Sequence, residues 1–148
     1  MASEILRRHF PDRIGDYFLP MRIGSTAASA DEGAALILAG TKTATSSAHW
    51  HYPDGRIPFV GALSVLVDGA DMPRGIVETT RVELTPLASV DAAFAWSYGE
   101  GERTLDWWRR VIGDWYRADA ARHGHTVDES TIIICEWLRI ACVLEPAR

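Results

Sequence analysis

A continuous apolar run near the end of the chain is the feature that most restricts how it can fold. Residues 132–144 read IIICEWLRIACVL, in which only Glu136 and Arg139 are charged. So long a run of branched and aliphatic residues favours a β-strand. Residues 62–68 and 74–84 have strand character as well, and the turn between them contains Gly69 and Pro73, which predicts a hairpin. The chain is therefore expected to build a sheet.

Helical signals alternate with these strands. A short helix over 3–10 is expected to end at Pro11, and the Gly- and Pro-punctuated residues 11–28 to form an irregular arm. Three further helices are predicted. One covers residues 30–39, with Ser29 as its cap and Gly40 as its terminator, and one covers residues 89–96, with Ser89 as its cap. The third covers residues 104–123 and ends at Gly124. In the longest helix, Trp108, Ile112 and Trp115 recur at helical spacing and are expected to face the core.

The length and composition indicate one domain. The chain has 148 residues, of which 47% are hydrophobic and 24% charged, as in ordinary globular proteins. Strands with three or four helices around them predict an α+β fold. We expect an N-terminal helix and arm over residues 1–23 and the main domain over residues 24–148.

Charge and cysteine content exclude several classes of protein. The net charge of −5 argues against a protein that binds duplex DNA through a broad basic face. The two cysteines, Cys135 and Cys142, are an odd number of residues apart on one predicted strand, so they should point to opposite faces and remain free thiols. With no signal-peptide core and no membrane span in the sequence, the expected location is the cytoplasm.

Lys42 is the only lysine, and the other fourteen basic side chains counted as Lys or Arg are arginines. Arginine supplies a permanent charge, whereas a buried lysine can lose its proton. A single lysine beside Thr45 therefore suggests a base that activates a hydroxyl nucleophile. The acidic turn at residues 99–102, which contains Glu100 and Glu102, offers the third member of such a set. The alternative is that Lys42 is an ordinary surface residue.

Other catalytic motifs are absent or weak. Thr41 separates Gly40 from Lys42, and the segment follows a helix, so it is not a phosphate-binding loop. There is no Gly-x-Ser-x-Gly element. His49 and His51 have a spacing suited to metal ligands, but two histidines in a loop are weak evidence for a metal site.

The order of several short motifs resembles the ASCH family, whose members share the PUA-like β-barrel of RNA-binding domains with flanking helices. The resemblance covers about residues 24–142. It rests on LAGTKTATS at 38–46, Val60-Gly61 with the strand at 64–68, IVETTRV at 76–82, GEGERTL at 99–105 leading into WWR at 107–109, and CEWLR at 135–139.

The resemblance implies a hydrolase without a cofactor. Small bacterial relatives with a similar Gly-x-Lys-x-x-Thr motif remove the acetyl group from N4-acetylcytidine, using Thr, Lys and Glu. By analogy, Thr45 would be the nucleophile and Lys42 its base, and the acid would be Glu100 as first choice or Glu102 as second. Candidate substrate-contacting residues are Thr43, Ser46, Trp50, Arg56 and Glu136. Glu136 would lie on a strand facing the cleft and read an amino group of the base; the alternative is a buried acid paired with Arg139 or Arg81.

Two other activities remain open at the level of sequence. Other ASCH relatives, which this longer form resembles, are ribonucleases, some of them metal-dependent. That resemblance implies that Lys42 would stabilise a phosphorane or position phosphate, while Thr45 or Ser46 would bind rather than attack. His49, His51, Glu100 or Glu102 would then hold a divalent metal. A non-catalytic RNA-binding module would use Lys42 and Arg56 on phosphate and Trp50 or Tyr52 for stacking on an unpaired base. In each case the expected partner is a nucleoside or single-stranded RNA.

Overall fold

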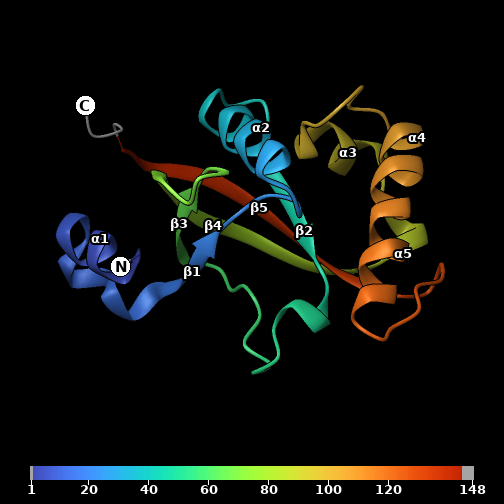
Figure 1. Ribbon diagram of the computed structural model, residues 1–148, viewed down its shortest axis with the longest axis horizontal. Coiled ribbons are helices and arrows are strands. Elements are labelled where there is room, and N and C mark those ends of the chain that lie inside the picture. Colours follow the sequence, from blue (N-terminus) through green and yellow to red (C-terminus); the bar gives the residue numbers. More distant parts are fainter. Residues whose placement is uncertain (1, 145–148) are drawn as a thin grey trace.

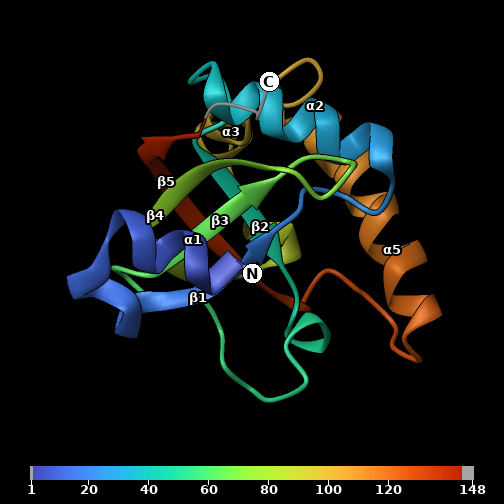
Figure 2. The ribbon, with the colours of Figure 1, turned by 60° about the vertical axis from the view of Figure 1, so that its left-hand side comes forward.

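A computed structural model describes residues 2–144 of the chain, so Met1 and residues 145–148 of the expected domain ranges lie outside it. A central sheet is flanked by helices, with α1 and α5 at opposite ends of the molecule in both ribbon views (Figures 1 and 2). The strands are β1 (Tyr17–Met21), β2 (Ala44–Ser47), β3 (Leu63–Val67), β4 (Pro73–Pro86) and β5 (Ile132–Val143). The helices are α1 (Ala2–His9), α2 (Ala27–Leu38), α3 (Ala92–Tyr98), α4 (Leu105–Trp107) and α5 (Gly113–Arg122), with shorter turns η1 (Pro11–Asp16), η2 (His49–His51), η3 (Leu87–Ser89) and η4 (Trp108–Ile112).

The sheet is mixed and open. Its strand order is β1-β3-β4-β5-β2, with β1 parallel to β3 and the other neighbours antiparallel. The α+β class is confirmed, but the expected closed barrel is not formed, because β1 and β2 are the two edges and do not pair with each other. The long β4–β5 ladder has register shifts between Ile76 and Val77 and between Thr79 and Arg81. Such irregularities bend a sheet locally.

The predicted hairpin and the C-terminal strand are present, whereas β1 was missed in the sequence. It forms inside the segment expected to be irregular, and Pro20 within it had argued against a strand. Proline lacks an amide donor, but β1 is an edge strand, where that loss is tolerated. Its pairing with β3 and the full burial of Leu6 from α1 beside Leu63 and Val65 bring the N-terminal segment into the core.

Helix boundaries differ from expectation mainly at their starts. Thr26, not Ser29, caps α2, and Ser29 is the third helical residue of a reciprocal capping box. Asp91, not Ser89, caps α3 by accepting a hydrogen bond from the backbone N–H of Phe94 at 2.8 Å. The sequence offered several capping residues at each start, and only the path of the backbone selects one.

The long helix expected over 104–123 is present with one irregularity. Thr104 caps α4, and a π-helical turn at Trp108–Ile112 joins it to α5. Trp108 and Ile112 are buried in the core, as expected, while Trp115 is half-buried. A π-turn shifts the helical face that follows it. In the part of the chain that the structure describes, no helix is both long and apolar enough to cross a bilayer.

Candidate active site

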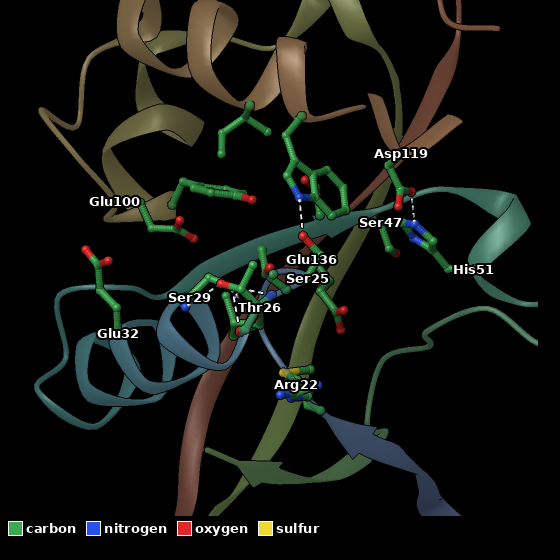
Figure 3. A pocket seen from close by; sticks show the side chains of 18 of the residues that line it. Arg22, Ser25, Thr26, Ser29, Glu32, Ser47, His51, Glu100, Asp119 and Glu136 are labelled. Carbon is green, nitrogen blue, oxygen red and sulfur yellow. Dashed lines mark hydrogen bonds and ion pairs between the residues drawn. The ribbon is translucent and has the colours of Figure 1, made fainter. Parts of the chain in front are cut away.

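A cavity of about 900 Å³ opens between the two unpaired edges of the sheet. One wall comes from β1 and the start of α2, another from β2 and Glu136 of β5, and a third from the helix that carries Trp107 and Trp115. Figure 3 shows Glu100, Glu136, Asp119 and the start of α2 arranged around it. Such a volume is typical of sites for small organic ligands. The open sheet edge therefore creates the binding space that a closed barrel would remove.

Lys42 lies behind the cavity wall and is 1% exposed. Its Nζ is 2.7 Å from Oε2 of Glu100, donates a hydrogen bond of 3.1 Å to the carbonyl oxygen of Tyr98, and lies 3.4 Å from the centroid of the Tyr98 ring. Burial lowers the pKa of Lys42 to about 8, while the carboxylates of Glu100 and Glu136 oppose the shift. The surface alternative for this residue is therefore excluded, and its amine can exchange a proton near neutral pH.

The turn after α3 brings Glu100 to Lys42. Gly99 has a φ of +71°, and a Cβ there would lie 2.3 Å from the carbonyl oxygen of Thr41, so the turn requires glycine to approach the segment that carries Lys42. Glu100 lines the cavity, with 22% of its side chain exposed. Glu102 is exposed and does not line the cavity. The geometry thus favours Glu100 over Glu102 as the acidic partner.

Strand β2 presents Thr45 and Ser46 to the cavity. Thr45 is buried and lies opposite Glu136 in the β2–β5 register. Ser46 accepts a 2.7 Å hydrogen bond from the hydroxyl of Tyr116. Within the described residues, no hydrogen bond joins Lys42 Nζ to Thr45 directly. Glu100 contacts Lys42 and lines the same cavity as Thr45.

Glu136 is 3% exposed, lines the cavity and accepts a 2.8 Å hydrogen bond from the Thr79 hydroxyl on Oε2. Burial raises its pKa to about 7, against the opposing effects of Thr79 and Lys42. The sequence had left open a pairing with Arg139 or Arg81. Arg139 instead contacts Glu78, and Arg81 contacts Glu83. Among residues 2–144, Glu136 is therefore a cavity-facing carboxyl group without a guanidinium partner.

Three of the expected substrate-contacting residues do not line the cavity. Trp50 stacks on His125, with ring centroids 5.0 Å apart, and its Nε1 donates to Asp119 at 2.8 Å. Arg56 donates to the carbonyl oxygen of Tyr17 at 2.8 Å, and Thr43 is exposed, with a 3.3 Å bond to the carbonyl oxygen of Ser97. Their positions depend on tertiary contacts that the local sequence does not encode.

The two histidines considered as metal ligands point into different environments. His51 lies at the cavity, with Nε2 2.6 Å from Oδ2 of Asp119 and Nδ1 accepting from the backbone N–H of Ala48. His49 is exposed and packs against His125. Among residues 2–144, no cluster of three or more His, Cys, Asp or Glu side chains is arranged to hold a metal ion.

Three aromatic residues of the site were missed in the sequence. Trp107 and Trp115 line the cavity, although Trp115 had been expected in the core, and Tyr98 lines it as well. Tyr52, which the sequence suggested for stacking on a base, is also in the lining. Burial, followed by the charge of Glu100, raises the pKa of Tyr98 above its usual range, with the hydroxyls of Ser46 and Thr45 opposing the shift. The π-turn at Trp108–Ile112 changes the helical face, so uniform helical spacing could not place Trp115.

An open mixed sheet with flanking helices, and a cavity lined by a glutamate that contacts a buried lysine, define an α+β protein with a candidate small-molecule site. The family model of the ASCH domain matches residues 20–141, and the chain belongs to this family. A search of the curated proteins returned no match.

Two solved structures resemble the whole fold. The ASCH domain from Lactobacillus crispatus JV V101 has a TM-score of 0.83 and 25% sequence identity, over 95% of this chain and 94% of that one. Protein EF3133 from Enterococcus faecalis V583 has a TM-score of 0.80 and 22% identity, over 99% and 97% of the two chains. The second similarity supports the fold alone.

Proposed function

We propose that this protein is an amidohydrolase that removes the acyl group from an N4-acylated cytidine, with N4-acetylcytidine as the reference substrate. The observation that carries the proposal is the contact of buried Lys42 with Glu100, which together with Thr45 lines a cavity large enough for a nucleoside. An acylated exocyclic amine is an amide, so its hydrolysis requires an activated nucleophile. Thr45 supplies the hydroxyl, and the pair supplies the base.

The proton of Thr45 leaves through Glu100. Because Lys42 is walled off from the cavity, its amine receives the proton by way of the carboxylate that it contacts at 2.7 Å. With Lys42 neutral, the pair carries one negative charge and accepts a proton; afterwards Lys42 is an ammonium beside a carboxylate. A pKa of about 8 keeps a fraction of the lysine neutral at physiological pH. Arginine could not replace it, because its guanidinium stays charged.

The charge around the cavity favours a neutral nucleoside over an RNA strand. Its described lining includes a single arginine, Arg22, and five residues with carboxyl groups: Glu32, Glu100, Asp114, Asp119 and Glu136. Phosphate groups would be repelled by such a lining, since nucleic-acid sites concentrate positive charge. The aromatic rings of Tyr52, Trp107 and Trp115 offer flat apolar surface to a base. The ribonuclease and RNA-binding alternatives draw less support from this lining.

The test is an assay of purified protein with N4-acetylcytidine, in which cytidine and acetate are separated and quantified. Wild type should release both, whereas Lys42→Arg and Glu100→Gln should lose at least about 100-fold in kcat/KM. Glu102→Gln is the matched control, because that glutamate is exposed outside the cavity, and it should retain activity.

A parallel reaction with single-stranded RNA, with and without chelator, tests the alternative. Cleavage of RNA by wild type, together with no release of acetate from N4-acetylcytidine, would overturn the proposed function.

A further inference from the structure

Glu136 is a buried carboxyl group beside the nucleophile that the proposed mechanism leaves without a role. It lies opposite Thr45 across the β2–β5 ladder, and both residues line the cavity. Side chains opposed in this way share a face of the sheet, with Cβ atoms about 4.5–5.5 Å apart. Any group attacked by Thr45 is therefore held next to Glu136.

The two oxygens of Glu136 have different surroundings. Oε2 accepts from the Thr79 hydroxyl, whereas no hydrogen bond to Oε1 occurs within the described part of the chain. The charged or polar neighbours are Thr79 from β4, Lys42 from the segment before β2, and Tyr52 from the loop after η2, which feels the charge of Glu136. Burial raises the pKa of Glu136 to about 7, so near neutral pH a large fraction carries a proton.

The geometry of the substrate brings a matching acceptor to this oxygen. In an N4-acylcytidine, the reacting carbonyl carbon is bonded to N4, and ring atom N3 is bonded to the same carbon, C4, as N4. C4 is flanked by N3 and C5, and the orientation that turns N3 toward Glu136, which lies opposite Thr45 and lines the cavity, gives the carboxyl group a matching acceptor. A protonated carboxyl group donates one hydrogen bond, and N3 accepts one.

We propose, resting on the amidohydrolase function above, that protonated Glu136 binds N3 of the pyrimidine and delivers its proton there as the acyl–N4 bond breaks. The tetrahedral intermediate on Thr45 re-forms its carbonyl, and the bond between the acyl carbon and N4 breaks. The electron pair passes from N4 through C4 to N3, which takes the proton from Oε1. The products are acyl-Thr45 and the imino form of cytidine, which returns to the amino form in water. Water then hydrolyses the acyl-threonine, and Glu136 is reprotonated from solvent.

The experiment compares wild type and Glu136→Gln on N4-acetylcytidine and on its 3-deaza analogue, in which N3 is replaced by C–H. Gln keeps the size of Glu and can donate a hydrogen bond to N3, but it cannot transfer a proton. With N4-acetylcytidine, kcat should fall by about 100-fold or more while KM changes little. With the 3-deaza analogue, the two proteins should have equal kcat values, because that substrate has no atom to protonate.

A second readout separates this role from a structural one. In wild type, kcat/KM should reach a maximum at about pH 7.5, because it rises as Lys42 loses its proton and falls above about pH 8 as Glu136 loses its own. In Glu136→Gln the fall should be absent, so that kcat/KM rises to a plateau above about pH 8. Unchanged kcat in the variant, or an equal loss with both substrates, would overturn the proposal.

If wild type releases no acetate, the proposed function fails and the transfer step fails with it. The contact with N3 is then tested by measuring the affinities of cytidine and 3-deazacytidine by calorimetry. Wild type should prefer cytidine by about tenfold, the value of one good hydrogen bond to a charged or strongly polar group. Glu136→Leu should lose that preference, and equal affinities in wild type would overturn the contact.

Discussion

The Nζ atom of Lys42 lies 2.7 Å from a carboxylate oxygen of Glu100, and the lysine side chain is fully enclosed. Despite this ion pair, burial dominates and lowers the lysine pKa to about 8. The folded protein therefore holds the charged lysine at a net cost in stability. Polar groups that weaken a fold in this way are typical of functional sites.

Lys42→Met combined with Glu100→Gln should abolish hydrolysis and raise stability. Met fills similar space without charge, and Gln at position 100 leaves no carboxylate without its partner, so the free energy of unfolding should increase by about 1–3 kcal/mol at pH 7. The unfolded chain holds the lysine proton up to its ordinary pKa of 10.5, and the folded chain only to about 8. The increase in the free energy of unfolding should thus be complete below pH 8 and become smaller as the pH rises towards 10.5. Urea unfolding at pH 7 and at pH 10 measures this increase. A loss of stability at pH 7 would contradict the prediction.

Glu136→Gln should stabilise the protein with the opposite pH dependence. The folded pKa of about 7 lies above the unfolded value of 4.5, so wild type loses stability as pH rises between these values. The variant should match wild type near pH 4.5 and exceed it by about 2–3 kcal/mol above pH 7. Thermal or urea unfolding at several pH values tests this. A difference that does not vary with pH would show that folding does not shift the pKa of Glu136.

Thr45→Val and Thr43→Val form a matched pair on neighbouring positions. Thr45 lines the cavity, so loss of its hydroxyl should lower kcat by about 1,000-fold or more while cytidine still binds. Thr43 is exposed and outside the lining, so the same substitution should change kcat/KM by less than about twofold. Steady-state kinetics with N4-acetylcytidine separates the two. Similar losses in both would point to a general effect on β2.

Gly99→Ala and Gly40→Ala test the turn that positions Glu100. Both glycines have positive φ, but a Cβ at Gly99 would meet the backbone of Thr41 and Lys42, whereas nothing lies within 4 Å of one at Gly40. Gly40→Ala should cost about 1 kcal/mol, and Gly99→Ala about 2–4 kcal/mol. Only Gly99→Ala should also reduce kcat, because it displaces Glu100 from Lys42. Equal melting temperatures for the two variants would contradict this account.

Much of the fold was predictable because its signals are local. The strand pattern of residues 132–144, the hairpin before it, and the helix ends at Gly40 and Gly124 depend on residues close in sequence. Strand β1 was not predictable in this way. Its partner is β3, far along the chain, and Pro20 hid the pattern.

The features of the candidate site also divide into those that the sequence predicts and those that depend on the tertiary structure. By itself, the sequence singled out Lys42 as the one lysine, placed it beside Thr45 and narrowed its partner to Glu100 or Glu102, since residue type and spacing are written in the chain. Only the tertiary structure decided that Lys42 is buried, that Glu100 rather than Glu102 contacts it, and that Trp115 rather than Trp50 lines the cavity. Burial and contact depend on segments distant in sequence, which meet only when the sheet has formed and left its two edges unpaired.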